Sequence, residues 1–167
     1  GIRERSHKDK APYAQWVDDG YMFATPCDSV DHEWVCSFLA HRLNGRSVTS
    51  VEFDRWRIEN FESAAKHTAF YDMVREWSPV GQGYQSFSPR LEALEIAMAA
   101  GNIRHGSHPL LNLGAANAIS VSDPAGAQKL DKSKSTQRID MIVAMVMAVY
   151  PLLDGERDDF SLGGVIG

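Results

Sequence analysis

The sequence is short of positive charge, of cysteine and of long apolar runs, and each shortage excludes a class of protein. Its net charge of −5 argues against bulk electrostatic attraction to nucleic acid or to an anionic membrane. The longest apolar run, residues 141–153, is well below the roughly 20 residues that a membrane-spanning helix needs. The polar N-terminus GIRERSHKDK lacks the apolar segment of a signal peptide. We therefore expect a protein without a membrane segment.

Cysteine and histidine are too scattered to predict a metal site. Cys27 and Cys36 are not spaced like a metal-binding pair. The sequence leaves a disulfide between them open, although nothing else suggests secretion. With His32 they match no common zinc pattern. His105 and His108, in RHGSHP, are interpreted as turn residues. The serine-hydrolase, zinc-protease and ATPase phosphate-loop motifs are also missing, so those three activities have no support.

What is present is the composition of an ordinary globular domain. The chain has 167 residues, 44% hydrophobic and 23% charged, with no internal repeat. We assign residues 1–153 to one domain and expect a flexible Gly-rich tail over 154–167. Hydrophobic spacing, caps and turn residues predict the elements: strands at 20–26 and 47–54, a short strand or loop at 76–83, helices at 32–44, 59–68, 88–101 and 137–152, and a hairpin turning at 123–126. Strands that alternate with helices predict an α/β fold, a sheet flanked by helices.

Two carboxylates lie at positions that often carry catalytic or ligand-binding residues. Asp54 ends the predicted strand SVTSVEFD, and the carboxyl ends of strands carry the working residues of many α/β proteins. Its simpler interpretation is a turn acid. Asp140 lies in the first turn of the predicted final helix, where the helix dipole alone favours an acid. A strand-end carboxylate and a helix-start carboxylate together are what a hard, oxygen-liganded ion such as Mg²⁺ uses.

Asp140 needs a partner. Residues 143, 144 and 147 share its helical face, so we expect its side chain to face the packed sheet, where a bare carboxylate is costly. Lys132, Lys134 or a metal ion can supply the opposing charge. The same locally basic segment, which includes Arg138, can also contact phosphate on an otherwise acidic domain.

Five motifs in a consistent order resemble the C-terminal nuclease domain of the large terminase subunit of tailed bacteriophages. They are PYAQW at 12–16, the helix VDHEWVCSFLAHRL at 30–43, the strand end FDRW at 53–56, the stretch from GQGYQSFSP to RHGSHP and its following Asn, and the lysine-rich KLDKSKSTQRID at 129–140. The resemblance covers most of the chain. It implies an RNase H-like mixed sheet with helices on both faces.

The resemblance also implies a function. Such domains cut concatemeric double-stranded DNA with two Mg²⁺ or Mn²⁺ ions, in the cytoplasm of the bacterial host and together with a portal protein and a small terminase subunit. Asp54 matches the family's central catalytic acid and Asp140 its last. Lys132, Lys134 and Arg138 would then bind DNA phosphates.

One departure keeps other readings open. The family's first acid lies on a strand upstream of the Pro-Tyr-x-x-Trp segment, so we expect the first strands and that acid to be missing here, and the chain to be inactive alone. Asp28 and Asp31 do not match its place. The alternatives are a non-catalytic module of the same fold that docks DNA or the portal, and a resolvase- or integrase-like nuclease.

Overall fold

The protein is described here by a computed structural model, which describes residues 1–26, 29–56, 58–135 and 138–153. The predicted tail, Cys27 and Asp28 lie outside this description. The elements in chain order are α1 (Ile2–Lys8), α2 (Tyr13–Asp18), α3 (His32–Leu43), β1 (Val48–Asp54), α4 (Glu59–Ala65), α5 (Ala69–Met73), β2 (Val74–Val80), α6 (Tyr84–Ala99), α7 (Pro109–Asn117), β3 (Ser120–Ser122), β4 (Gln128–Leu130) and α8 (Asp140–Leu153). Within the described residues, no helix is long and apolar enough to cross a membrane.

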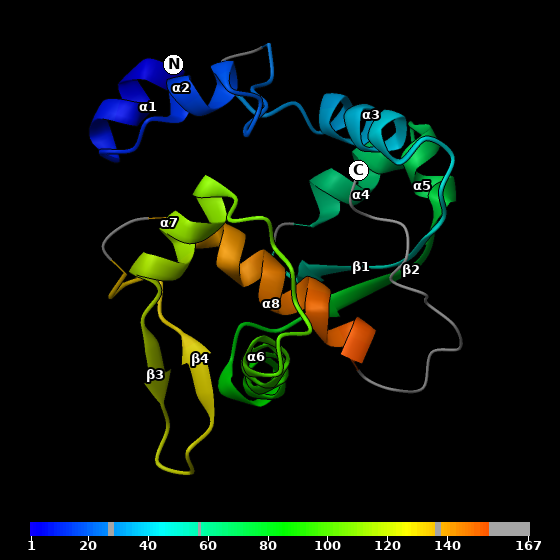
Figure 1. The fold of residues 1–167 in the computed structure, drawn as a ribbon. Coiled ribbons are helices and arrows are strands. Elements are labelled where there is room, and N and C mark those ends of the chain that lie inside the picture. The colour runs from blue at the N-terminus through cyan, green and yellow to red at the C-terminus, as the bar shows by residue number, and fades with distance from the viewer. Residues whose placement is uncertain (27–28, 57, 136–137, 154–167) are drawn as a thin grey trace.

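The central feature is the parallel pair formed by β1 and β2, with helices on both sides (Figure 1). The register aligns Val48 with Val74 at one end and Asp54 with Val80 at the other. Parallel neighbours need a crossover, and the segment containing α4 and α5 supplies it. The predicted α/β class is therefore confirmed, and Asp54 lies at the carboxyl end of the pair.

Two apolar cores hold the helices to this pair. The first is formed by α6, α8 and the end of β2, with Phe87 and Val146 almost completely buried. The second lies under α3, α4 and α5, where Cys36 and Phe70 are buried and Trp77 packs against them. The apolar run of the final helix is thus explained by burial against α6 and β1 rather than by a membrane.

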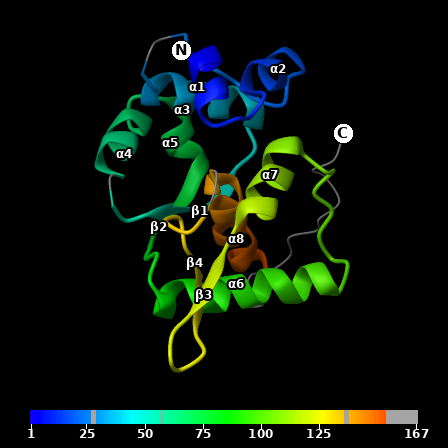
Figure 2. The ribbon, with the colours of Figure 1, turned by 90° about the vertical axis from the view of Figure 1, so that its left-hand side faces the viewer.

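The β3–β4 hairpin projects from the body below α7, as Figures 1 and 2 show. Its turn is where the sequence predicts it, because Asp123 Oδ1 accepts the backbone N–H groups of Ala125 and Ala127, both at 2.9 Å. The hairpin is antiparallel and separate from the β1–β2 pair. Gln128 N–H donates to Ser88 Oγ at 3.0 Å, which ties β4 to α6.

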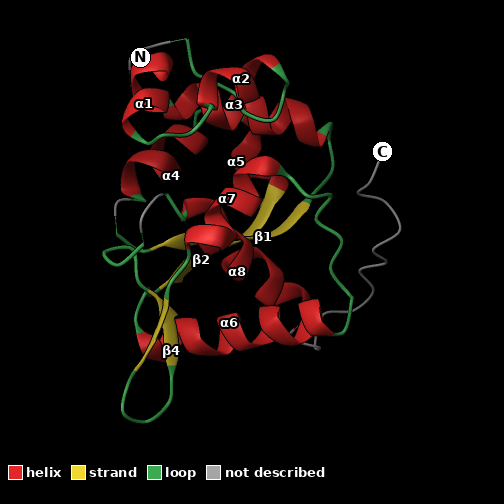
Figure 3. Cartoon of the chain, turned by 60° about the vertical axis from the view of Figure 1, so that its left-hand side comes forward, coloured by secondary structure: helices red, strands yellow, loops and turns green. Residues whose placement is uncertain are grey.

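One predicted element is wrong, and another is confirmed with a different start. The predicted strand at 20–26 is irregular, because the N–H groups of Tyr21 and Met22 both donate to the Trp16 carbonyl and fold the chain back onto α2. The predicted helix at 88–101 begins earlier, at Tyr84, with Pro89 inside it. The early start buries Phe87 in the first core, which sequence caps alone do not reveal. Figure 3 shows the resulting dominance of helix over strand.

Candidate active site

Asp54 lies at the carboxyl end of β1, as the sequence predicts. Its Oδ1 accepts the backbone N–H of Trp56 at 3.1 Å, which turns the chain as the strand ends. The turn interpretation is therefore correct for one carboxylate oxygen. No other hydrogen bond to this carboxylate occurs among the described residues, so its second oxygen is available to a ligand.

Asp140 is the first residue of α8, and its partner is Lys132, whose Nζ lies 3.0 Å from Oδ1. The expectation that the Asp140 side chain faces away from water is wrong, because this side chain is 62% exposed and that of Lys132 is 54% exposed. The position of Asp140 in the fold explains this exposure. Asp140 is the first residue of α8 and lines two open cavities, whereas the buried residues next to it, Ile139 and Ile142, turn their side chains into the first core.

The first cavity, of about 510 Å³, is lined by both predicted acids. β1 contributes residues 50–54 as one wall, and α8 contributes Val143, Ala144 and Met147 as the other. Lys132 and Gln82 complete the polar part of the lining. The structure therefore brings Asp54, Asp140 and Lys132 to a single cavity at the carboxyl end of the parallel pair.

Lys132 is presented by a short turn over residues 131–135. Asp131 Oδ1 accepts the hydroxyl of Ser133 at 2.6 Å and its backbone N–H at 2.9 Å. These hydrogen bonds, the hydroxyl one first, lower the pKa of the Asp131 carboxyl below its usual value. Lys134 lies exposed on the same turn but does not line the cavity. Asp131 thus fixes the backbone from which the ammonium of Lys132 reaches Asp140.

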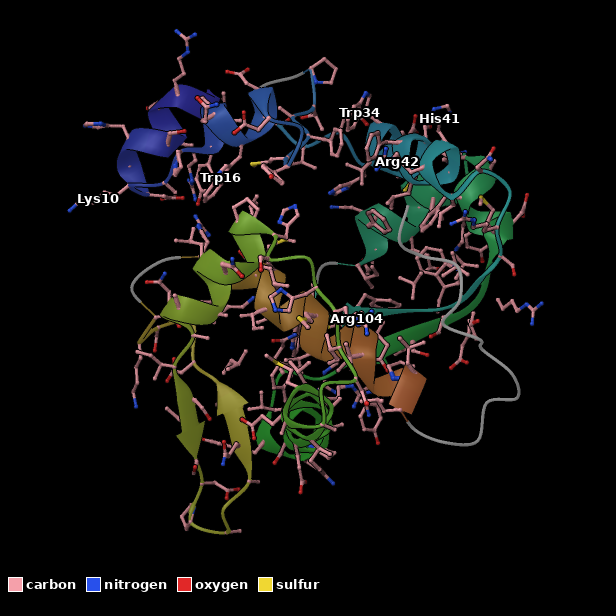
Figure 4. The ribbon with its side chains drawn as sticks, in the orientation of Figure 1. Lys10, Trp16, Trp34, His41, Arg42 and Arg104 are labelled. Carbon is pink, nitrogen blue, oxygen red and sulfur yellow. The ribbon has the colours of Figure 1, made fainter. Side chains whose placement is uncertain are left out.

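Arg138 is turned toward the N-terminal helices. Its Nε lies 3.6 Å from Asp9 Oδ2, and Asp9 also receives Arg5 Nε at 2.9 Å. Arg138 lines a second, larger cavity of about 1080 Å³, which extends from Asp140 under the N-terminal helices to α3 and α7. Trp34 lines it from α3, whose exposed face also carries Arg42 (Figure 4). Arg138 therefore belongs to a different wall from Lys132.

Sequence reasoning missed a third carboxylate, Glu52. It lines the first cavity two residues before Asp54, so strand alternation places both on one face. Arg90 of α6 binds it in bidentate fashion, Nε to Oε2 and NH2 to Oε1, both at 2.9 Å. The guanidinium also lies over the ring of Tyr150 in α8, 4.5 Å from its centroid. The period-two spacing could have found Glu52, but its engagement by Arg90 could not be read from the sequence.

The donor set of the first cavity suits a hard cation. Asp54 and Asp140 offer carboxylate oxygens, and Glu52 is already neutralised by Arg90. In the part of the chain that the structure describes, no group of three or more metal-ligating side chains occurs. Cys36 is buried, and burial, followed by the charge of Glu33, raises the pKa of its thiol, so it is a packing residue.

Comparison with known proteins identifies the family. The model of the terminase large subunit, endonuclease domain, matches residues 2–156. The large terminase subunit of Enterobacteria phage HK97 is 43% identical over 148 residues, which are 89% of this chain and 29% of that protein. A crystal structure of the HK97 large terminase matches with a TM-score of 0.79 and 42% identity, covering 88% of this chain and 30% of that one. The chain thus spans less than a third of the length of these relatives. It belongs to the family of terminase large subunit endonuclease domains.

Proposed function

We propose that the chain is the two-metal-dependent endonuclease domain of a viral DNA-packaging terminase, which cleaves concatemeric double-stranded DNA. The observation that carries the proposal is the cavity lined by Asp54, Asp140 and Lys132 at the carboxyl end of β1. The family membership adds that relatives with the same fold are large terminase subunits. The family suggests a portal protein and a small terminase subunit as partners. It suggests the bacterial cytoplasm as the location.

Asp54 and Asp140 would hold Mg²⁺ or Mn²⁺, because both are carboxylates with oxygen atoms open to the cavity. Bound at such a site, two metal ions supply a nucleophile at neutral pH and neutralise charge on the attacking and leaving oxygens. With Asp54 and Asp140 as the two carboxylate ligands of the cavity, most of the coordination shell would be water. This accords with weak metal binding and with low activity of the chain by itself.

Lys132 would exchange its ion pair with the Asp140 carboxylate for one with a DNA phosphate. In the free protein its ammonium neutralises Asp140, and both side chains are more than half exposed. Such a pair contributes about 1 kcal/mol or less, so metal binding at Asp140 can displace it at small cost. The released ammonium would then bind the phosphate that lies in the cavity. Lys134 on the same turn and Arg138 at the second cavity would contact phosphates farther along the backbone.

The second candidate is a non-catalytic module that docks DNA or the portal. The observation in its favour is that Glu52, the third carboxylate of the cavity, is held by Arg90 and gives no third metal ligand. Plasmid nicking with Mn²⁺ separates the two candidates. Asp54→Asn and Asp140→Asn are compared with Asp18→Asn, an exposed acid at the end of α2 that serves as the control.

In the chain extended by the upstream segment of its HK97 relative, the endonuclease predicts Mn²⁺-dependent nicking that both active-site variants lose and the control keeps. The docking module predicts DNA binding with no nicking under any metal. If extension of the chain by the upstream segment of its HK97 relative leaves it unable to nick, the endonuclease proposal is wrong. Nicking that persists in Asp54→Asn and Asp140→Asn would also overturn it.

A further inference from the structure

Directly after Asp54, the chain exposes a tryptophan and an arginine that the proposed cleavage chemistry does not use. Trp56 is 71% exposed, the highest exposure among the large apolar side chains of the described residues. All four tryptophans of the chain are described, and the other three are at least half buried against neighbouring rings. Trp16 and Trp34 (Figure 4) pack against Tyr13 and Phe38, and Trp77 packs in the second core.

Trp56 differs because its ring is covered only by a cation. The Arg55 guanidinium carbon lies 5.8 Å from the centroid of the Trp56 ring. Arg55 forms no ion pair with a carboxylate of the described residues, unlike Arg90 or Arg138. A large aromatic face and an unpaired guanidinium therefore stand side by side in solvent, one and two residues beyond a candidate catalytic acid.

Three contacts fix this pair in place. Asp54 Oδ1 accepts the Trp56 N–H, and the Arg55 N–H donates to the Val80 carbonyl at 3.3 Å. The guanidinium lies against Gly81, where a Cβ atom would come within 3.3 Å of the Arg55 NH2. The absence of a side chain at Gly81 thus makes room for Arg55. The pair is anchored to both strands and is oriented before any ligand arrives.

We propose that Arg55 and Trp56 form a nucleotide-binding site beside the cleavage site, in which Trp56 stacks on an unstacked base and Arg55 binds the adjoining phosphate. This inference rests on the proposed nuclease function, since it takes the strand to be cut as the ligand. Aromatic faces and guanidinium groups together are what proteins use to hold single-stranded nucleic acid. A base inside a duplex offers no free face, so the site selects a strand that is unpaired or frayed near the cleaved phosphate.

The test is binding of a fluorescent single-stranded oligonucleotide and of a blunt duplex, measured by anisotropy in EDTA over a salt series. Without metal, no cleavage occurs and the result is independent of nicking. We expect Trp56→Ala to weaken single-strand binding roughly 5- to 100-fold with an unchanged salt slope. We expect Arg55→Ala to weaken it and to reduce the salt slope by about 0.7, the value for one phosphate contact.

Four further variants make the test specific. Trp56→Phe should retain most of the affinity. Gly81→Ala should weaken binding less than Arg55→Ala, because the added Cβ meets the Ser86 hydroxyl at 3.0 Å and the Arg55 guanidinium at 3.3 Å, and a small shift of this flexible side chain relieves the contact. Tyr21→Ala, an exposed aromatic on the segment before α3, and Arg75→Ala, an exposed arginine at the other end of β2, are the matched controls. Melting curves establish that each variant is folded.

Affinity within about twofold of wild type for Trp56→Ala, or an equal loss in Tyr21→Ala, would overturn the site. So would failure of the wild-type chain to bind the oligonucleotide, or sedimentation showing that Trp56→Ala instead abolishes self-association. Trp56-dependent binding, with no Mn²⁺-dependent nicking even by the chain extended with the upstream segment of its HK97 relative, would keep this site and refute the nuclease. Mn²⁺-dependent nicking that is unchanged in Arg55→Ala and Trp56→Ala would keep the nuclease and refute this site.

Discussion

The Nζ of Lys132 lies 3.0 Å from the Oδ1 of Asp140, so the acid at the start of α8 already has a cation in the free protein. The pair bridges the turn after β4 and the first turn of α8. It explains how an acid is tolerated at the edge of an apolar helix without a bound metal. It also means that any metal ion at Asp140 competes with an ammonium that belongs to the protein.

Removal of that competitor should strengthen metal binding. In Lys132→Ala we expect the affinity for Mn²⁺ to rise by roughly 1.4- to 5-fold, the equivalent of an exposed ion pair of about 0.2–1 kcal/mol. Nicking should nevertheless fall, because the phosphate loses its ammonium. Calorimetric titration checks the first effect. Lys134→Ala, from the same turn but outside the cavity, is the control, and weaker Mn²⁺ binding in Lys132→Ala would contradict the competition.

Asp140→Asn should abolish Mn²⁺-dependent nicking and leave the fold intact. The amide keeps the shape of the side chain but loses the charge that attracts metal. Because Asp140 is 62% exposed and loses only an exposed ion pair and a helix-start charge, the free energy of unfolding should change by about 1 kcal/mol or less. Thermal melts in chelator measure this. An unfolded variant would show that Asp140 is structural.

Divalent metal should bind the chain weakly. Two carboxylate ligands, one of which must first give up its ion pair with Lys132, predict a dissociation constant on the order of 10⁻⁴–10⁻³ M, the weak end of oxygen-ligated sites. A chain extended by the upstream segment of the HK97 relative should bind more tightly if that segment brings a further acid. Calorimetry on both forms, with Asp54→Asn as the control that loses binding, decides this. Micromolar binding by the unextended chain would mean that another ligand has been missed.

The Glu52–Arg90 pair should matter far more for stability. Glu52 is 8% exposed and Arg90 17%, so removal of one partner leaves a poorly solvated charge. We expect Arg90→Met to lower the free energy of unfolding by about 3 kcal/mol, or the melting temperature by roughly 6–12 °C. The double variant Glu52→Gln/Arg90→Met should recover part of the loss. If the loss in the double variant instead equals the sum of the losses in Glu52→Gln and Arg90→Met, the two groups are not coupled.

Acid should loosen the turn that carries Lys132. The pKa of Asp131 is lowered in the folded state, first by the Ser133 hydroxyl, so its contribution to stability is present above the usual carboxyl pKa and is lost as the pH falls through the folded value. NMR titration of Asp131 should give a pKa below 3.8 in the wild type. In Ser133→Ala the pKa should rise toward that value. An unchanged pKa in the variant would contradict the assignment.

The sequence predicted most of what local rules determine. Asp54 at a strand end and the turn at Asp123 each depend on neighbours within a few residues, and both are confirmed. The failures depend on distant partners. Residues 20–26 have strand-like composition, but no strand is available to them, and their backbone returns to α2.

The features of the candidate site also fall into those that local sequence predicts and those that depend on distant packing. The positions of Asp54 and Asp140 were predictable, because strand ends and helix starts can be read from periodicity. Their arrival at one cavity, the exposure of Asp140 and the capture of Glu52 by Arg90 depend on how α6 and α8 pack against β1. Packing between elements far apart in the chain leaves no trace in a local pattern.

That separation has a consequence for the order of events during synthesis. β1 is made early, whereas α8, which provides the other acid and the wall of the cavity, is made last among the described elements. Chains grow at about 5–20 residues per second, so several seconds pass during which Asp54 exists without Asp140. A nascent chain, or one degraded before α8 docks, carries half of the cavity at most. A chain that has not yet reached α8 therefore presents Asp54 without Asp140, and the two acids can line one cavity only once α8 has been made and has docked.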